Sequence, residues 1–243
     1  MTMSDTKTNN SEAIDVMFKA GAHFAFSRSR RHPTLEPFIF GVKNRVEIFD
    51  LEKTSSLLEK AQNFVRTLAS EGKQILFVGG KNEARDAIKK AALSLDMPHV
   101  SGRWIGGTLS NFKEIRSRVE KLLDLTAKRE KGELAKYTKK ERLLIDRDIE
   151  KLDRFFSGLI PMKELPKALF VIDSKHEKIA VTEARKMGIP VIALLGSDCD
   201  LRAVNHGIPG NDASTASIAF FVDKIAWAYK EGRNERLKAQ QNA

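Results

Sequence analysis

The side chains of this sequence that are best suited to chemistry are cations, and they are concentrated in one short stretch. Between Phe18 and Arg45 six basic residues accompany a single acidic residue, Glu36, which leaves a charge of +5 over 28 residues. The planar guanidinium group of arginine binds phosphate oxygens through paired hydrogen bonds, so this density of arginine predicts contact with phosphate groups. The alternative is a solvated basic loop. The six residues are Lys19, Arg28, Arg30, Arg31, Lys43 and Arg45.

A loop is expected to carry the densest part of this charge. Residues 27–33 read Ser-Arg-Ser-Arg-Arg-His-Pro and include no apolar side chain before the proline. Because the residue that precedes a proline is restricted to extended conformations, the segment is predicted to be exposed and not helical.

A second candidate for phosphate chemistry is Gly79-Gly80-Lys81-Asn82, which follows an apolar run and precedes a helical pattern. A Walker A motif would need glycine where this chain has Ile75, and serine or threonine where it has Asn82. No Gly-x-Gly-x-x-Gly occurs in the sequence. Gly80 is therefore interpreted as a tight turn between strand and helix, although a bare helix N-terminus can still accept a phosphate.

Carboxylates form the third candidate. Asp173, Asp198 and Asp200 follow predicted strands, where α/β folds bind ligands, and His176 is near them in sequence. They could hold a divalent metal ion, but capping and loop-ordering roles are the more ordinary explanation of this spacing. The single cysteine, Cys199, excludes an intramolecular disulfide, and no histidine stands at a spacing that would activate it. We therefore predict no catalytic residue, no bound metal and no cofactor.

The composition narrows the class of protein. Among 243 residues, 42 are Lys or Arg and 32 are Asp or Glu, a net charge of +10 that favours a polyanionic partner such as nucleic acid. No apolar run approaches the roughly 20 residues that span a bilayer, and residues 1–10 are polar, unlike a secretory signal. The sequence predicts a soluble, cytoplasmic protein with no membrane contact.

Strands and helices alternate along most of the chain. Gly41, between the apolar run 38–40 and residues 46–50, predicts a hairpin-like connection. The continuous apolar runs at 75–78, 168–172 and 191–195 are typical of strands buried on both faces. Between the last two, Ser174 and Glu177 form a potential capping box for a helix that Gly188 ends, and Ile179 is expected to face inward. This arrangement predicts a right-handed βαβ unit. The fold class is predicted to be α/β, a mainly parallel sheet with helices on both faces.

One segment departs from this layering. Residues 113–154 carry 14 basic and 10 acidic side chains, and their apolar residues recur at heptad-like spacing on either side of Gly132. Thr138 and Glu141 form a second potential capping box. The pattern predicts two antiparallel helices that project from the body as a coiled-coil hairpin; a helical pair lying flat on the sheet is the alternative.

Several stretches, in order over residues 14–232, match the pattern of one known family. The most specific of them are Arg103-Trp104-Ile105-Gly106-Gly107-Thr108-Leu109 and Ile208-Pro209-Gly210-Asn211-Asp212. The others include Ala20-Gly21-Ala22-His23-Phe24, Pro37-Phe38-Ile39-Phe40-Gly41, Asp50-Leu51-Glu52-Lys53-Thr54, Lys139-Lys140-Glu141 and Gly188-Ile189-Pro190-Val191. In these stretches the chain resembles the family of bacterial small-subunit ribosomal protein two.

The resemblance implies a Rossmann-like or flavodoxin-like body, formed by residues 13–107 and 157–232, with an inserted hairpin at 108–156. Residues 1–12 are predicted to be a disordered N-terminal tail, and residues 233–243 a short polar tail that is also disordered. It further implies a structural, non-enzymatic role: binding 16S-type ribosomal RNA (rRNA) on the solvent side of the small subunit, between head and body, and helping to dock ribosomal protein one. No small-molecule substrate is expected. The alternative function is a nucleotide- or metal-dependent enzyme that uses the carboxyl ends of the strands.

The residues expected to contact rRNA fall into three groups. Arg28, Arg30, Arg31, Lys43 and Arg45 would contact phosphates, and His32 would stack on or hydrogen-bond to an unpaired base. Arg103 and Trp104 would contact a phosphate and stack on a base, with core packing as the alternative for Trp104. The third group consists of exposed cations of the hairpin: Lys113, Arg116, Lys139 and Lys140.

Overall fold

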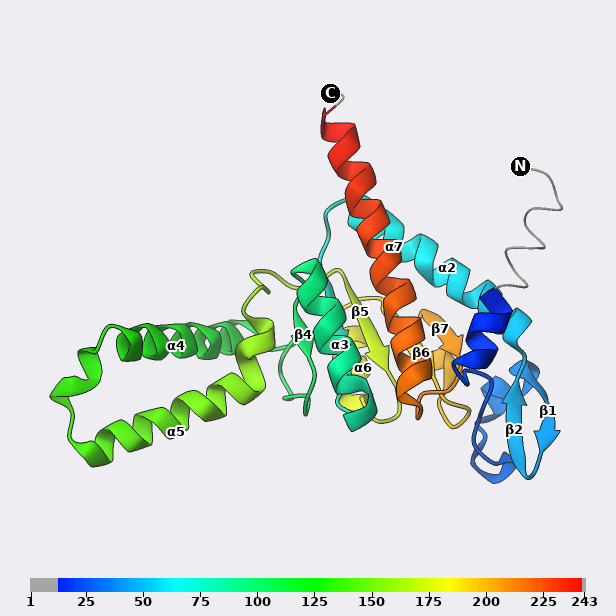
Figure 1. The fold of residues 1–243 in the computed structure, drawn as a ribbon, viewed down its shortest axis with the longest axis horizontal. Helices are drawn as coiled ribbons and strands as arrows, with labels where there is room; N and C mark the ends of the chain where they lie inside the picture. Colours follow the sequence, from blue (N-terminus) through cyan, green and yellow to red (C-terminus); the bar gives the residue numbers. More distant parts are fainter. Residues whose placement is uncertain (1–12, 242–243) are drawn as a thin grey trace.

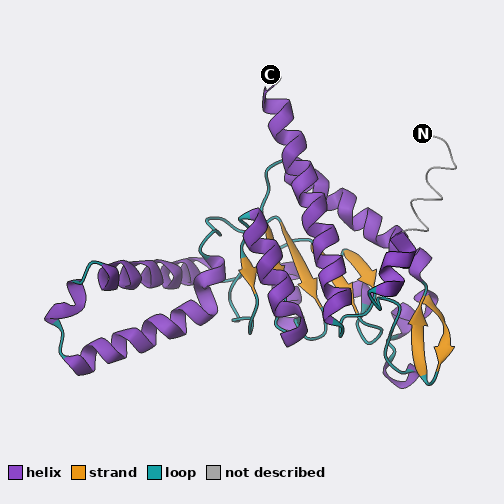
Figure 2. Cartoon of the chain, viewed as in Figure 1, coloured by secondary structure: helices purple, strands orange, loops and turns teal. Residues whose placement is uncertain are grey.

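Five short, mostly apolar strands form the centre of the molecule. The computed structural model describes residues 13–241, and in it these strands make one parallel sheet in the order β4-β3-β5-β6-β7 (Figures 1 and 2). Every residue of β3, β5 and β6 is buried, as the unbroken apolar runs predict. The strands are β3 Ile75–Val78, β4 His99–Val100, β5 Ala168–Ile172, β6 Val191–Leu195 and β7 His206–Pro209.

Helices cover both faces of this sheet, so the predicted three-layer α/β fold is confirmed. Successive side chains of a strand point to opposite faces, and the two faces accordingly build two separate cores. Phe77 and Phe170 pack beneath α2 Leu51–Ser70, α3 Asn82–Leu95 and α7 Thr215–Gln241 (Figure 1). The opposite face, which includes Leu76 and Val171, is covered by α6 Lys178–Lys186 and by the root of the helical hairpin.

The βαβ unit formed by β5, α6 and β6 is present, with Leu169 opposite Val191 in parallel register. Its helix differs from the prediction in two respects. Helix α6 begins at Lys178 and not directly after Ser174, and Ile179, expected to point inward, is 59% exposed. Glu183 is buried on the inner face because several backbone N–H groups donate to its carboxylate.

A helical hairpin projects from one end of the sheet (Figure 1). Helix α4 Phe112–Glu130 leads out, a short 3₁₀ turn follows Gly132, and α5 Lys139–Phe156 returns. The predicted capping box between Thr138 and Glu141 is confirmed. Only a narrow apolar seam joins the two helices, so most of their surface faces solvent and can carry charged residues. Supercoiling of the pair stays a prediction. The buried seam consists of Leu122, Ile149 and Leu152.

A small antiparallel hairpin, β1 Ile39–Lys43 and β2 Val46–Phe49, lies at the other end of the molecule. Its turn is formed by Asn44 and Arg45, whose φ angles of 52° and 65° are typical of the two-residue turn that matches strand twist. Gly41 was the expected connection, but it lies within β1, where the register shifts.

The C-terminal residues are helical, contrary to the expected disordered tail. Helix α7 continues to Gln241, and Arg233 in this stretch donates a hydrogen bond of 3.3 Å to the carbonyl oxygen of Leu95. The predicted tail at 1–12 and the last two residues lie outside the described range. Among the helices of residues 13–241, none combines the length and apolar character needed to cross a bilayer.

Candidate nucleic-acid interface

The arginine-rich loop is held in place by the loop that follows β6. Residues Arg28–Arg30 form a single 3₁₀ turn. The buried hydroxyl of Ser197 accepts a hydrogen bond from the backbone N–H of Phe26 at 3.0 Å, and its carbonyl accepts from that of His32 at 2.8 Å. The loop is therefore fixed at both ends, which lowers the conformational entropy that its cations lose on binding a ligand.

The three arginines of this loop have different surroundings. Arg28 is exposed and forms no ion pair with any residue between 13 and 241. Arg30 is exposed, lies over the ring of Phe26 at 4.3 Å, and approaches Asp198 at 3.6 Å. The guanidinium of Arg31 donates to Glu36 at 2.7 Å and to Glu47 at 2.8 Å.

Arg31 is consequently bound within the protein. Its partner Glu47 is 0% exposed, and its own side chain is 16% exposed. Breaking such a pair would leave a buried charge without a partner. Its expected phosphate contact stays a prediction, but the structure gives Arg31 an evident role in fastening the loop to strand β2.

His32 begins the second 3₁₀ helix, Pro33–Phe38, and is half-buried. Its Nδ1 lies 2.8 Å from the hydroxyl of Thr34, which in turn accepts a hydrogen bond from the backbone N–H of Leu201. The imidazole is thus oriented by the body, and one of its edges is already used.

Lys43 and Arg45 flank Asn44 at the tip of the small hairpin, and both are exposed. Within the described part of the chain neither takes part in a salt bridge. Arg45 adopts a left-handed backbone conformation that a bulky residue rarely adopts. An unpaired arginine in a strained turn, facing solvent, is better explained by binding than by stability.

The segment around Arg103 and Trp104 is organised by Glu183 of α6. The carboxylate of Glu183 accepts hydrogen bonds from the backbone N–H groups of Gly107 at 2.6 Å and Leu109 at 3.1 Å. Trp104 is 6% exposed and its Nε1 donates to the same carboxylate at 3.4 Å. Core packing, the alternative stated for Trp104, is what the structure shows, because so deeply buried a ring cannot stack on a base. Arg103 beside it is exposed.

The predicted rRNA-binding cations of the helical hairpin also differ in their surroundings. Lys113, Lys139 and Lys140 are exposed, and none of them has a salt bridge to a residue of the described chain. Arg116 instead donates to Glu120 at 3.3 Å and to the carbonyl oxygen of Met162 at 3.4 Å, so that it fastens α4 to the segment after α5.

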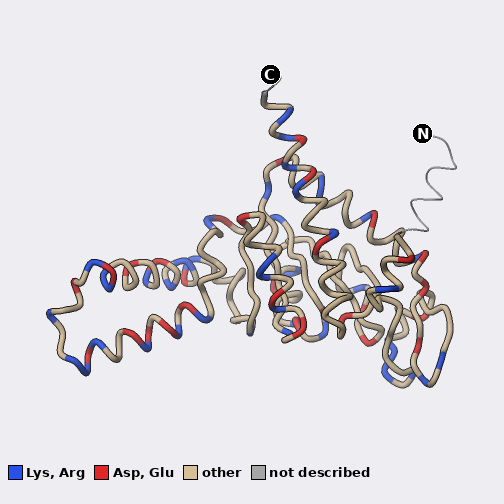
Figure 3. Tube along the Cα trace, in the orientation of Figure 1, with Lys and Arg blue, Asp and Glu red and all other residues tan. Residues whose placement is uncertain are grey.

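The two lysines at the start of α5 stand where the helix dipole is unfavourable to them. Lys139 and Lys140 occupy the first turn, whose free N–H groups carry a partial positive charge that attracts anions. The backbone trace shows basic residues on both sides of the outer turn of the hairpin (Figure 3). A phosphate placed here would satisfy both the lysines and the dipole.

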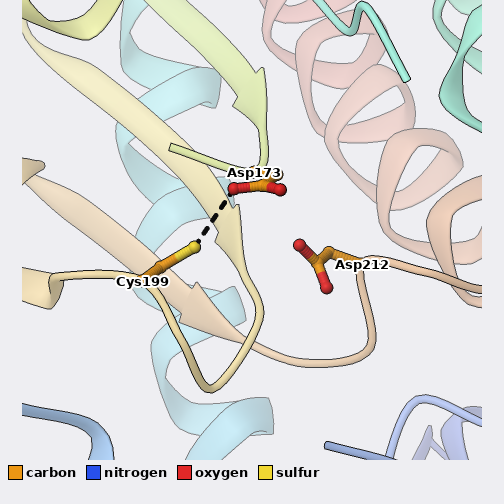
Figure 4. A group of neighbouring side chains, drawn as sticks. All are labelled: Asp173, Cys199 and Asp212. Atoms are coloured by element: carbon orange, nitrogen blue, oxygen red, sulfur yellow. Dashed lines mark hydrogen bonds between the residues drawn. The ribbon is translucent and has the colours of Figure 1, made fainter. Parts of the chain in front are cut away.

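The carboxyl ends of the strands hold a buried group of Asp173, Cys199 and Asp212, whose ligand atoms lie within 4.8 Å of one another (Figure 4). The ammonium of Lys81 lies between the two carboxylates, 2.6 Å from Asp173 and 2.8 Å from Asp212. The left-handed backbone of Asp173, with φ of 65°, turns the chain so that its carboxylate also accepts the N–H of Lys175. Lys81 thus supplies the positive charge of this group, and it joins three segments of the chain.

Burial and the neighbouring charges shift the pKa values of Cys199 and Lys81 in this group. Burial, followed by the neighbouring carboxylates, raises the pKa of Cys199 to about 12, so the thiol stays protonated and is not a nucleophile near neutral pH. Burial opposes the charge of Lys81, but Asp212 and Asp173 outweigh it and raise the pKa of the ammonium. Gly80, for which a tight turn was predicted, lies in the short loop 79–81 between β3 and α3, and a Cβ on it would lie 2.9 Å from the carbonyl oxygen of Gly102.

The other carboxylates considered as ligands do not join this group. Asp198 pairs with Lys175 at 2.8 Å, Asp200 caps a 3₁₀ turn by accepting from Arg202, and the Nδ1 of His176 lies 2.8 Å from Glu177. Sequence reasoning missed Lys81 and Asp212 as partners and Glu183 as the centre of the second segment. The burial of Asp212 and Glu183 and the ion pairs of Lys81 identify them, and both are properties of the folded chain.

Comparison with known proteins agrees with these observations. The family model described as "Ribosomal protein S2" matches residues 17–232. A curated protein of Coprothermobacter proteolyticus, named "Small ribosomal subunit protein uS2", is 43% identical over 220 residues, which cover 90% of this chain and 82% of that protein.

Proposed function

The chain belongs to the ribosomal protein S2 family, and from this premise we propose that it is a structural, non-catalytic component of the small ribosomal subunit that binds the subunit's rRNA. The binding is electrostatic and shape-dependent. Cations fixed on a rigid scaffold contact phosphates, and little of the base sequence is recognised directly.

One observation carries this proposal: exposed cations that form no salt bridge with any residue from 13 to 241 gather on three projecting parts of the molecule. Arg28 lies on the arginine-rich loop, Lys43 and Arg45 on the small hairpin, and Lys139 and Lys140 at the far end of the helical hairpin. A lone exposed ion pair contributes little, but unpaired charges on fixed protrusions attract the phosphate backbone of a folded RNA.

The distance between the parts explains why one chain would carry several cationic sites. The small hairpin and the helical hairpin lie at opposite ends of the body (Figure 1). A protein with this shape contacts more than one RNA helix and holds them in a fixed relation. The solvent side of the small subunit, between its head and body, and contact with ribosomal protein one are the location and partner that the family resemblance suggests for it.

Two features at the carboxyl ends of the strands support a non-catalytic role. The ammonium of Lys81 is bound to Asp173 and Asp212, so it is not available to a nucleotide phosphate in this conformation. The thiol of Cys199, whose pKa is raised to about 12, hydrogen-bonds to Asp173 at 3.3 Å. Calorimetry with nucleotides and Mg²⁺ tests the alternative enzyme directly, since tight binding would favour it.

Incorporation into ribosomal particles is the decisive experiment. The tagged chain should co-migrate with small subunits on a sucrose gradient, and its binding to isolated small-subunit rRNA should fall roughly a thousandfold between about 50 and 200 mM salt if about six phosphates are engaged. Absence from the particle together with a flat salt response would refute the proposal.

A further inference from the structure

A polar pocket of about 210 Å³ lies where the root of the helical hairpin meets the edge of the sheet. Its walls come from four parts of the chain: α3, the edge strand β4, the loop that follows it, and the end of α5 with the 3₁₀ turn after it. A water molecule needs only about 15 Å³ of such volume, so the pocket has room for a small polyatomic ion together with water.

Three cations line this pocket, and each comes from a different element. They are Lys89 of α3, Arg103 of the loop after β4, and Arg154 of α5. All three are exposed, and none forms a salt bridge with another residue in the range 13–241. The only acidic residue of the lining is Asp153, so the pocket carries a net charge of 3 − 1 = +2.

The inner wall provides neutral polar groups. His99 is 9% exposed, and its Nδ1 has no hydrogen-bond partner among the described residues. Burial, followed by the charge of Lys89, lowers the pKa of His99, so the imidazole is neutral at pH 7 and does not add to the repulsion. Ser101 and Ser157 add hydroxyl groups to the lining.

The pocket is held in shape by a close approach of two backbones. A Cβ on Gly158 would lie 2.2 Å from the carbonyl oxygen of His99, so only glycine allows the end of α5 to rest on β4. Arg154, one turn earlier, lies with its guanidinium 5.6 Å from the ring centre of Phe155. Arg103 lies in the loop after β4, four residues before Gly107, whose backbone N–H donates a hydrogen bond to Glu183.

Unpaired like charges that converge on one pocket repel one another unless an anion lies between them. Arginine forks, an ammonium and hydroxyl donors that approach from different sides suit a tetrahedral oxyanion, which offers acceptors in several directions. We infer that this pocket binds one phosphate group, and, resting on the proposed function, that the group belongs to the rRNA backbone. Bound there, the phosphate joins the hairpin to the body, because its ligands come from both.

Two measurements on the full chain test this inference. In the first, inorganic phosphate is titrated into ¹⁵N-labelled protein while the amide signals of Gly102 and Gly158 are followed. We expect saturable shifts in the wild type that are lost in the variant with Arg103→Gln and Arg154→Gln. Lys90→Gln is the matched control, because Lys90 is the next exposed lysine of α3 and lies outside the lining.

The second measurement is the salt dependence of binding to small-subunit rRNA. The slope of log affinity against log salt counts the phosphates that are neutralised, at about one unit for each. Because the three cations share one phosphate, the triple variant should lower the slope by about one unit. Lys89→Gln, Arg103→Gln and Arg154→Gln should each lower it by no more than that. Three separate contacts would instead lower it by about three units in the triple variant, and that result overturns the inference.

The remaining outcomes separate this inference from the proposed function. Phosphate shifts with an unchanged slope in every variant would overturn rRNA as the source and leave a free phosphate ion as the ligand. Absence of shifts together with unchanged slopes would overturn the pocket itself. A wild type that does not bind rRNA would refute the proposed function, and the phosphate titration alone would then decide the pocket. The substituted side chains are exposed, so circular dichroism should confirm that each variant is folded.

Discussion

The guanidinium of Arg31 lies 2.8 Å from the carboxylate of Glu47, which is completely buried beneath the arginine-rich loop. The two residues are 16 positions apart, on the loop and on strand β2. A second carboxylate, that of exposed Glu36, is 2.7 Å from the same guanidinium. One of the three arginines therefore holds the loop in place, which leaves Arg28 and Arg30 facing solvent.

Replacing Arg31 should mainly reduce stability. Arg31→Gln leaves the Glu47 carboxylate buried without its cation, and breaking a buried pair in this way costs about 3 kcal/mol of unfolding free energy. Urea denaturation followed by circular dichroism measures this loss. A change of less than about 0.5 kcal/mol, which is usual for a surface substitution, would contradict the assigned role.

Arg28 provides the matched comparison on the same loop. Arg28→Gln should leave the unfolding free energy within about 0.5 kcal/mol of the wild type, because Arg28 is exposed and forms no ion pair in the described chain. Its affinity for small-subunit rRNA should fall, with the salt slope lower by about one unit. Equal effects of the two variants on stability would show that the arginines do not differ as described.

Replacing Arg45 in the turn of the small hairpin should raise the stability of the protein and weaken its binding to rRNA. Arg45 has a φ of 65°, a conformation that costs a non-glycine residue about 1 kcal/mol. Arg45→Gly removes this strain and yields an Asn-Gly turn, which is the preferred two-residue connection. We expect a higher urea midpoint together with weaker rRNA binding. Unchanged binding would show that Arg45 does not contact RNA.

The carboxylate of Glu183 should be essential for the segment that leads into the helical hairpin. Glu183→Gln removes the charge and turns an N–H₂ group toward backbone donors, at an expected loss of about 3 kcal/mol. Loss of the near-ultraviolet signal of Trp104 should accompany it, because the indole donates to the same carboxylate. Glu114→Gln on the exposed surface of α4 is the control and should change stability by less than about 0.5 kcal/mol.

Lys81 should be needed to keep two buried carboxylates together. Lys81→Met leaves Asp173 and Asp212 facing each other without a cation, and we expect a loss of about 3–5 kcal/mol at pH 7. The loss should shrink as the pH falls toward 5, because two like charges favour the uptake of a shared proton in the folded state. Adding Asp212→Asn to this variant should restore part of the stability at pH 7, and failure to do so would argue against electrostatic coupling.

The loss of folding stability at acidic pH should be due in part to His23. This imidazole is buried between Phe18 and Phe24, with ring centres 4.2 and 4.1 Å away, and burial lowers its pKa. The neutral form is favoured on folding, so its contribution is fully present above pH 6.5 and is lost as the pH falls below that value. His23→Phe removes the titrating group. Between pH 7.5 and 5.5 the variant should lose less stability in urea than the wild type, and equal losses would contradict this prediction.

The architecture was predictable from sequence because it depends on local patterns. The unbroken apolar run 75–78 specifies a strand covered on both faces, and the Thr138–Glu141 pair specifies the start of α5. Chain order then leaves few ways to arrange parallel strands. The predicted turn at Gly41 was wrong, because Asn44 and Arg45 adopt left-handed conformations that their residue types only weakly suggest.

The candidate site was less predictable, because its assignments depend on contacts between distant parts of the chain. Nothing near Arg31 in sequence indicates that Glu47 neutralises it, and nothing near Trp104 indicates that Glu183, 79 residues later, binds its indole N–H. A sequence therefore shows which cations could contact RNA but not which of them the fold has already paired. Burial, which separates the two sets, is known only from the structure.

The last helix of the chain completes the core that the earlier elements leave open. Ile218, Phe221 and Val222 of α7 pack in the same core as Phe77, although they follow strand β3 by about 140 residues in the sequence. A nascent chain that has not reached them exposes the part of this face that α2 and α3 leave uncovered. Folding of the body thus waits for the synthesis of α7, so that a nascent chain without this helix depends on protection from aggregation.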